Sequence, residues 1–486
     1  MKGNLTGTSQ TRCLFTLVLS MAFFTCQAQQ NSTLFFMHSL PEANIVNPAV
    51  QINCGLFIGL PIVSSLHGNY SNSGFTPGDI VTLYTDGSMD RNMDFNTSSI
   101  KGVNFILTEF HVNLLAIGLR RNDYYFSFTV TEKDQTATLY TGDLVTFILR
   151  GDPEFEGTSV KLKGTHVSFN HFREYAFGVS KVFTDQLTLG VKAKLLFGKY
   201  NLTTGNSSFG MFVEENTGNI VFDIDGGFNS SIPYSLQSNN PGTYRFYQTN
   251  DATTINQLMN PRNPGVALDF GFIYKYSSRL TFSGSLLDLG LIRYRSDVTN
   301  YSLQGSYSYN GPFGATMVTG EYLWDVFDEM NLNMSDEVTY DAYTYYLDPK
   351  LYLGAAYQMN KYFDLNMLVF NRLLPNRMQT GTTVSLLARP SETLAASISW
   401  SYMNKSFNNL GIGFSFGKNP LQAYLVSDNI LGFVLPMSTR NVNLRVGINL
   451  ILDCKAKFNI NQCGCEWFKD AEDHRLRKEK AKRKTR

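Results

Sequence analysis

Few side chains in this sequence have the types and spacing that catalysis or metal binding needs. The six histidines are scattered. His166 and His171 lie five residues apart, so on one strand they would point to opposite faces and could not share a metal ion. The chain has no phosphate-binding loop and no His-Glu-x-x-His zinc motif. We therefore predict that the protein is not an enzyme and has no catalytic, cofactor-binding or metal-binding residues.

The cysteines are the other candidates for chemistry. Cys454, Cys463 and Cys465, with His474 beyond them, could ligate zinc, but the C-x2–4-C pair of zinc modules is missing. Disulfides are the favoured use of cysteines in an oxidising compartment. Cys54 near the other end of the chain is a fourth partner, and the sequence leaves the connectivity among the four open.

Alternating residues dominate the chain from about residue 101 to Leu452, and this pattern predicts strands. In the clearest run, the apolar residues Leu189, Val191 and Leu195 alternate with Lys192 and Lys194. Successive side chains on a strand face opposite sides, so one face would meet lipid and the lysines would face water inside a barrel. The final run, 442–452, has six apolar residues in register, the length of one tilted transmembrane strand.

Arg173 and Glu174 begin another such run. Glu174 would point inward and could pair with Lys192 or Lys194 on the neighbouring strand. We interpret these charges as structural partners rather than as substrate contacts. A change of parity near Gly284 predicts a bulge that turns Asp288 inward and sets Leu287 and Leu289 on the outer face.

Composition supports a membrane barrel. Charged residues make up 17% of the chain, against about 25% in ordinary soluble domains, and aromatic residues make up 14%. The mean hydropathy is −0.15, which excludes a helical membrane protein. The segment Lys469–Arg486 holds nine basic and four acidic residues, which leaves a mildly acidic body. That balance argues against nucleic acid as a partner.

The N-terminus has the order of features found in a signal peptide. Lys2 and Arg12 precede the apolar run 13–25, and the small-x-small triplet 26–28 would place the mature N-terminus at Gln29. We predict four segments: a signal peptide (1–28), an N-terminal segment that plugs the lumen (29–66), an outer-membrane barrel (67–453) and a basic periplasmic tail that carries cysteines (454–486).

Short polar turns alternate with long polar stretches, as in outer-membrane barrels with periplasmic turns and extracellular loops. The longest stretches are 201–262 and 296–348, which we predict to be loops. At about 30 residues per strand and connection, the chain would form about 14 strands, within a range of 12 to 16. The predicted fold is therefore an all-β, transmembrane antiparallel barrel. Its closure would bring Cys54 near Cys454, although Cys454 could instead pair with Cys463 or Cys465.

Several blocks occur in an order that resembles one family. They are Asn47-Pro48-Ala49, Gly59-Leu60-Pro61, 169–179 (FNHFREYAFGV), 288–292 (DLGLI) and 427–432 (SDNILG). Together they resemble a Bacteroidota outer-membrane barrel family, domain of unknown function 5723, and are distantly similar to type IX secretion barrels and fatty-acid-transporter-like barrels. The resemblance implies a barrel of about 14 strands over nearly the whole mature chain and carries no catalytic residue. The charged tail departs from a simple barrel.

Two functions fit this reading. The first is a transporter or channel for small or apolar solutes, in contact with outer-membrane lipid. The alternative is a non-transporting scaffold of a secretion or surface-assembly complex, with a periplasmic or secretion-system protein as partner. A solute-sized lumen free of residues 29–66 would favour the first, and a lumen filled by them would favour the second. The sequence does not identify the solute, the partner or the oligomeric state.

Overall fold

The computed structural model describes residues 31–79, 100, 102–150, 152–205, 208–215, 217–240, 243–248, 259–310, 335–375, 377–391, 393–404 and 406–452. The predicted signal peptide (1–28) and the predicted tail (454–486), with Cys454, Cys463 and Cys465, lie outside the described residues. No helix within the described ranges has both the length and the apolar character needed to cross a membrane.

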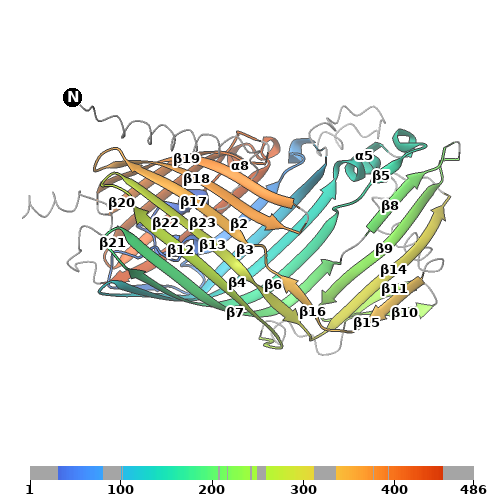
Figure 1. Cartoon of the computed structure of the whole chain (residues 1–486), viewed down its shortest axis with the longest axis horizontal. Helices are drawn as coiled ribbons and strands as arrows, with labels where there is room; N and C mark the ends of the chain where they lie inside the picture. The colour runs from blue at the N-terminus through green and yellow to red at the C-terminus, as the bar shows by residue number, and fades with distance from the viewer. Residues whose placement is uncertain are drawn as a thin grey trace, which may run out of the picture.

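Fourteen strands form a closed antiparallel barrel (Figure 1), which confirms the predicted fold class. β1 (Leu56–Gly59) and β2 (Leu66–Asn72) share the first position in the wall, and both pair with the last strand, β23 (Asn441–Leu452). The wall thus begins at Leu56, inside the range 29–66 that the sequence assigns to the N-terminal segment. The remaining wall strands, in order, are β3 (Val103–Arg121), β4 (Tyr124–Thr141), β6 (His166–Val182), β7 (Leu187–Thr204), β12 (Asn263–Lys275), β13 (Leu280–Tyr294), β16 (Tyr343–Tyr346) with β17 (Lys350–Gln358) in one position, β18 (Phe363–Leu374), β19 (Arg377–Ser391), β20 (Leu394–Tyr402), β21 (Leu410–Lys418) and β22 (Leu421–Ser427).

Short connections gather at one end of the barrel, which we call the short-turn end. They join β3 to β4, β6 to β7, β12 to β13, β17 to β18, β19 to β20 and β21 to β22, in line with the short polar turns predicted from the sequence. β1 starts and β23 finishes at this end, because Leu56 pairs with Leu452. The opposite end carries the longer connections, apart from the tight turn between β18 and β19.

The stretches predicted as loops contain strands, so that prediction was wrong in part. A sheet in the order β5–β8–β9–β14–β15, which we call the outer sheet, extends beyond the barrel wall (Figure 1). Its core includes Phe147 of the helix α5, with Val160, Phe222 and Tyr301 from its strands. Runs such as Ile220–Ser231 combine alternation with Asp, Gly and Asn, so their polar content hid the strand pattern. The bounds are α5 (Gly142–Arg150), β5 (Ser159–Lys161), β8 (Ser208–Val213), β9 (Ile220–Ser231), β14 (Val298–Tyr309) and β15 (Ser335–Thr339).

The remaining elements are short. β10 (Tyr234–Asn240) and β11 (Thr243–Gln248) form a separate hairpin. The helical turns are α2 (Ser32–Phe35), α3 (Ala43–Val46), η2 (Asp152–Phe155), α8 (Leu431–Val434) and η4 (Pro436–Ser438).

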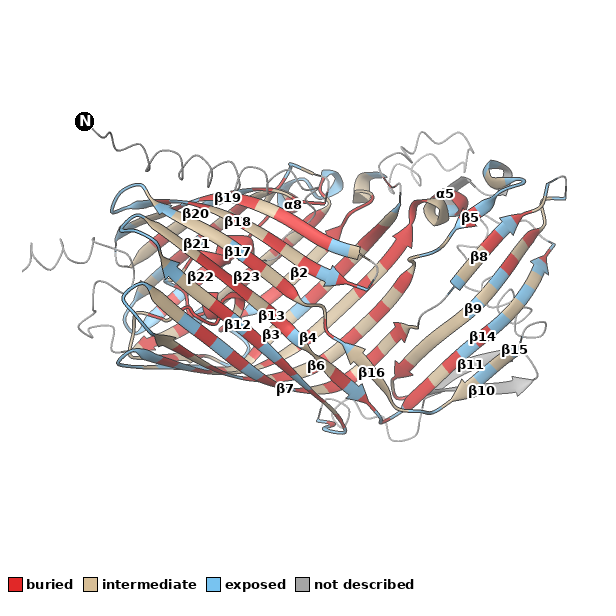
Figure 2. Cartoon of the chain, in the orientation of Figure 1, coloured by how far each residue is buried: buried red, intermediate tan, exposed pale blue. Residues whose placement is uncertain are grey.

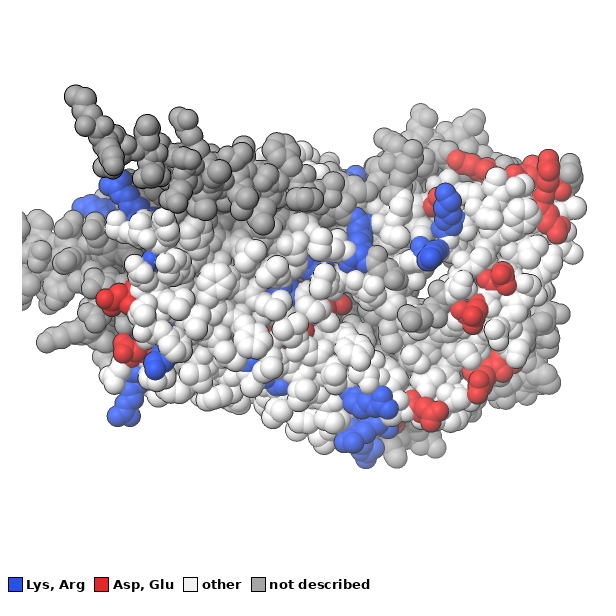
Figure 3. Space-filling model, in the orientation of Figure 1, with Lys and Arg blue, Asp and Glu red and all other residues white. Residues whose placement is uncertain are grey.

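Burial alternates along the wall strands as predicted (Figure 2). On β7, Val191 is 43% exposed on the outer face, whereas the inward Lys192 and Lys194 are only 4% and 5% exposed. We had expected these lysines to face water. They do not, because protein atoms fill the lumen around them. A space-filling view shows a largely uncharged band over the barrel wall and acidic side chains over the outer sheet (Figure 3).

The predicted bulge exists at a different residue. The register between β12 and β13 shifts between Leu268 and Phe270, so the extra residue lies at Leu287–Asp288 rather than at Gly284. Asp288 has a φ of 61° and is buried, as its predicted inward position requires. Leu287 is also buried, so its predicted place on the outer face is wrong.

Candidate functional site: a closed lumen

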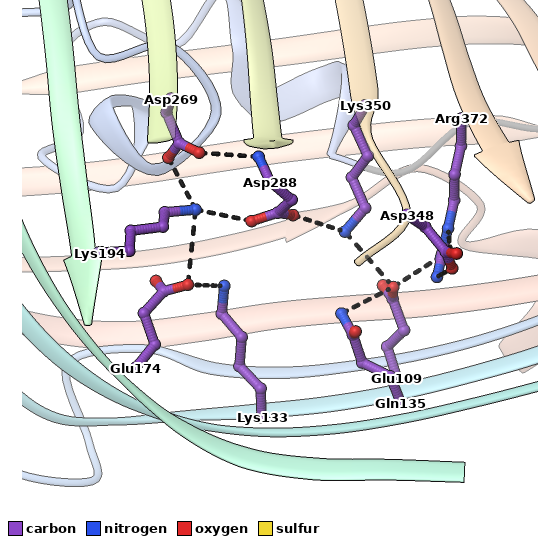
Figure 4. Close-up of polar contacts among 10 residues, drawn as sticks. All are labelled: Glu109, Lys133, Gln135, Glu174, Lys194, Asp269, Asp288, Asp348, Lys350 and Arg372. Atoms are coloured by element: carbon purple, nitrogen blue, oxygen red, sulfur yellow. Dashed lines mark hydrogen bonds and ion pairs between the residues drawn. The ribbon is translucent and has the colours of Figure 1, made fainter. Parts of the chain in front are cut away.

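Ion pairs join inward-facing side chains across the lumen (Figure 4). Lys194 on β7 is the hub: its Nζ lies 2.6 Å from Asp288 Oδ1, 2.7 Å from Asp269 Oδ2 and 3.4 Å from Glu174 Oε2. This confirms the predicted pairing of Glu174 with Lys194. The cation is buried among three carboxylates, so removing it would leave uncompensated charge that costs about 3–5 kcal/mol.

The network continues on both sides of this hub. Lys133 Nζ of β4 lies 2.7 Å from Glu174 Oε2. Lys350 Nζ of β17 lies 3.4 Å from Asp288 Oδ2 and 3.5 Å from Glu109 Oε1 of β3. Every one of these side chains is at least 88% buried, because the largest exposed fraction among them is 12%.

Arg372 completes what we call the ionic layer. Its Nη1 lies 2.7 Å from Glu109 Oε1, and its Nη2 lies 2.7 Å from Asp348 Oδ2. β3 is the second strand of the wall and β18 the ninth, so the contact of Glu109 with Arg372 bridges opposite sides of a barrel of fourteen strands. Four cations and five carboxylates thus form a nearly neutral layer across the lumen.

Residues 31–54, which we call the inner segment, also lie inside the barrel. Leu34 and Phe35 of α2 are fully buried, and they share a hydrophobic cluster with Tyr352, Phe370 and Val426 from the wall. The Phe35 and Tyr352 rings stack with centroids 5.6 Å apart. The lumen at this level is therefore a packed apolar core rather than a water-filled channel.

Polar contacts fix the inner segment to several wall strands. The backbone N–H of Thr33 donates to Asp428 Oδ1 at 2.7 Å, and Thr33 Oγ1 lies 2.7 Å from Ser399 Oγ. Ser285 donates to the carbonyl of Val46 at 2.5 Å. Lys192, which does not pair with Glu174, donates instead to the carbonyl of Asn44 at 2.6 Å.

Inward-facing glycines of the wall leave the space that this segment occupies. Gly190 of β7 and Gly271 of β12 face each other across the strand pair. A Cβ at Gly190 would lie 2.2 Å from the carbonyl oxygen of Pro48, and a Cβ at Gly271 would lie 2.2 Å from Asn47 Oδ1. Only glycine lets the Asn47-Pro48-Ala49 turn approach the wall this closely. These three residues are one of the blocks that carried the family resemblance.

Two titratable groups of the inner segment are perturbed by burial. Glu42 is 2% exposed, and its burial raises its pKa from 4.5 to about 7, even though Asn449 donates a hydrogen bond of 2.9 Å to its carboxylate and Arg445 lies nearby. Burial, followed by the charge of Arg389, lowers the pKa of His38 from 6.5 to about 4. The docked segment therefore favours both groups in their neutral forms.

The raised pKa of Glu42 predicts that ionisation weakens docking of the inner segment. A carboxyl whose pKa is raised in the docked state loses its stabilising contribution as the pH rises from about 4.5 to about 7. Glu42→Gln should match wild type at pH 4 and exceed it by about 3 kcal/mol at pH 8. The free energy of local opening, measured by hydrogen exchange of residues 31–54, tests this. His38 is present in both proteins, so its opposite pH dependence cancels, and a constant difference would contradict the prediction.

A cavity of about 400 Å³ lies beside the inner segment at the short-turn end. Phe36, Val50 and Ile52 of the inner segment form part of its lining, and residues of the turns, such as Ser278 and Asn419, form its rim. We call this cavity the vestibule. It reaches the turns on one side and is bounded by the inner segment on the other.

The other candidate residues remain apart. His166 Nδ1 lies 3.0 Å from Thr204 Oγ1 on the inner side, whereas His171 Nε2 lies 2.9 Å from Glu132 Oε1. In the part of the chain that the structure describes, no three His, Cys, Asp or Glu side chains are grouped to hold a metal ion. Cys54 is disulfide-bonded.

One pentapeptide has the spacing of a hydrolase nucleophile elbow, Gly413 to Gly417 around Ser415. It lies within β21 and not on a strand-to-helix turn, and Ser415 is buried. The local structure that exposes a nucleophile is therefore missing at this serine. Gly413 instead makes room for Met37 of the inner segment, whose sulfur would lie 2.4 Å from a Cβ there.

Comparison with known proteins places the chain in one family. No curated protein matches the sequence. Among solved structures, the Ralstonia pickettii toluene transporter TbuX is 10% identical, with 85% of this chain and 94% of that chain covered and a TM-score of 0.40. A Pseudomonas aeruginosa FadL homologue has the same identity and coverage and a TM-score of 0.37. The translocator domain of the Neisseria meningitidis autotransporter NalP is 8% identical, covers 92% and 99%, and has a TM-score of 0.28. The model of one family matches residues 48–428, which confirms the resemblance seen in the sequence, and the chain therefore belongs to the family of unknown function DUF5723.

Proposed function

We propose that this protein is an outer-membrane barrel that carries small or apolar solutes through its lumen when the inner segment moves aside. The short-turn end would face the periplasm and the outer sheet would face the exterior, following the general arrangement of bacterial barrels. The proposal rests on one observation. The inner segment closes the lumen by packing closely against the inward glycines of the wall, and it lies directly against the vestibule of about 400 Å³.

Two features support a moving segment over a permanent core. The vestibule has the volume of a small-molecule site, for which cavities of about 300–1,000 Å³ are usual. The buried Glu42 and Lys192 are polar groups that a permanent packing core has no need to contain. Ligands or conditions that stabilise the undocked segment would shift the population toward an open lumen.

A reversible disulfide between the inner segment and the wall, which we call the lock, tests the proposal. Thr33 Oγ1 and Ser399 Oγ lie 2.7 Å apart, so Thr33→Cys with Ser399→Cys would place two thiols within reach of a disulfide between the inner segment and β20. We expect the oxidised double variant to show no solute-dependent conductance in planar bilayers, and reduction to restore it to the wild-type level. Each single variant, and wild type treated with the same reductant, serves as a control.

The lock also separates transport from the alternative function. Equal conductance of the locked and reduced forms would contradict passage by displacement of the inner segment. Absence of conductance in wild type and in every variant would favour a non-transporting scaffold of a secretion or surface-assembly complex. Two observations favour this second candidate. Residues 31–54 fill the lumen, which is the outcome that the sequence analysis assigned to a scaffold. The outer sheet also has its own hydrophobic core beyond the barrel wall and exposes Asp223, Asp225 and Glu337.

A further inference from the structure

The vestibule is lined in part by apolar side chains. Phe36, Val50 and Ile52 come from the inner segment, and Leu394 and Ile451 come from β20 and β23. Covering such a surface with apolar side chains removes it from water and is favourable. The volume of about 400 Å³ is that of a small-molecule site, so a few side chains can enter the cavity but a folded partner cannot.

The chain leaves the barrel beside this cavity. Ile451 lines the vestibule and β23 finishes at Leu452, so the tail starts at the short-turn end. The long stretches 80–99 and 311–334 join β2 to β3 and β14 to β15, away from the short-turn end. Among these parts of the chain, the tail is therefore the one that begins next to the vestibule.

A disulfide provides a second, independent link between the tail and the cavity. Cys54 lines the vestibule and is disulfide-bonded. The other cysteines of the predicted mature chain are Cys454, Cys463 and Cys465, and all three belong to the tail. Whichever of them is the partner, the bond would tie the tail to the lining of the vestibule.

The part of the tail nearest to β23 has the apolar side chains that the cavity suits. Residues 455–462 (KAKFNINQ) include Phe458 and Ile460, which alternate with asparagines. Phe458 is six residues beyond Leu452, so an extended chain could carry it up to about 20 Å from the strand end. The segment 469–486, with nine basic and four acidic residues, would instead lose the hydration of its charges in an apolar cavity.

We propose that residues 455–462 dock in the vestibule, with Phe458 and Ile460 against its apolar lining. The occupant of the cavity is then a segment of the chain itself. A solute that enters from the short-turn end would have to displace this segment, and that consequence rests on the proposed transport function. The docking itself is independent of transport.

Trypsin sensitivity tests the docking, because Lys455 and Lys457 are cleavage sites inside the segment. We would digest the full-length mature protein in lipid nanodiscs, reduce its disulfides and follow the fragments by mass spectrometry. Where opening is fast relative to cleavage, the cleavage rate follows the population of the undocked state. The double variant Phe458→Ser with Ile460→Ser should therefore speed cleavage after Lys457 at least about tenfold, which corresponds to a loss of about 1.4 kcal/mol.

The same tail provides the matched control. Trp467→Ser with Phe468→Ser also removes two large apolar side chains, but from outside the docked segment, so cleavage after Lys457 should keep its wild-type rate. Cleavage after Arg475, in the charged part of the tail, should be equal in all of these proteins and serves as the internal standard.

A second pair of variants locates the docked segment. Ala356 of β17 lines the vestibule. Its neighbour Ala355 points to the outer face, because successive side chains of a strand alternate. Ala356→Trp would fill part of the cavity and should speed cleavage after Lys457, whereas Ala355→Trp should leave the rate unchanged.

Three outcomes would overturn the proposal. Equal cleavage after Lys457 in wild type and in the Phe458→Ser, Ile460→Ser protein would show that these side chains do not dock. Faster cleavage only in the Trp467→Ser, Phe468→Ser protein would assign the contact to another part of the tail. Protection that survives Ala356→Trp would place the segment outside the vestibule. The tail variants change no residue of the barrel, so they decide the docking even if Ala356→Trp does not assemble. Because cleavage measures no flux, a failed lock experiment would contradict transport and leave this result standing.

Discussion

Replacing Gly271 with leucine is expected to open the lumen. The first side-chain carbon would lie 2.2 Å from Asn47 Oδ1, 2.8 Å from Pro48 Cδ and 3.0 Å from the backbone nitrogen of Ala49, so the inner segment and the new side chain cannot occupy the same space. Overpacking of this kind costs about 1–3 kcal/mol, which would raise the undocked population about 5- to 150-fold. Single-channel recording should show a matching increase in open probability over wild type.

A glycine on the outer face provides the control. Gly68 of β2 has no atom within 4 Å of the position that a Cβ would take, so Gly68→Leu should leave conductance unchanged. Protease sensitivity of residues 31–54 reports undocking separately from conductance. A Gly271→Leu protein in which the segment becomes sensitive but conductance stays at the wild-type level would mean that the ionic layer alone closes the lumen.

The sequence predicted the wall of the barrel better than its contents. Strict alternation in β7 and β23 identified the faces, because an outer face against lipid needs apolar residues at every second position. The inward glycines 190, 271 and 413 were visible in the same pattern. The reason for glycine at these positions was not visible, because it depends on contact with residues 31–54, which are far away in the chain.

The ionic layer shows the same limit. Alternation placed Glu174 and Lys194 on the inner side, and neighbouring strands made their pairing foreseeable. The contact of Glu109 with Arg372 joins residues 263 positions apart and bridges opposite sides of the wall, so no local pattern encodes it. The strands of the outer sheet were not predicted for a different reason. They pack only one face on a core, and their polar composition resembles that of loops.

The position of the bulge depended on tertiary structure as well. A shift of parity in β13 can be absorbed at any of several residues. The structure places it at Asp288, where the backbone N–H donates to Asp269 Oδ1 at 2.8 Å and the carboxylate reaches Lys194. The ion pairs around Lys194 thus account for a backbone irregularity that the sequence could only locate to within a few residues.

The disulfide of Cys54 is expected to close the barrel seam. β1 and β23 pair antiparallel, with Gly59 opposite Asn449 and Leu56 opposite Leu452. Continuing this register by two residues would set Cys54 opposite Cys454, and Cys54 is disulfide-bonded. A bond between these residues closes a loop of about 400 residues, so in the chain-entropy model it stabilises the fold by about 6 kcal/mol. Cys54→Ser should therefore lower the free energy of unfolding by about this amount.

Two measurements distinguish this seam from the alternative pairings. Cys454→Ser should destabilise the barrel as much as Cys54→Ser does, and the two effects should not add, because both changes remove one bond. The double change Cys463→Ser with Cys465→Ser is the control and should have little effect. Peptide mapping without reduction should recover one linked pair of peptides that contains Cys54 and Cys454. Recovery of Cys54 as an alkylated free thiol, or linked to Cys463 or Cys465, would show that the seam is held by strand pairing alone.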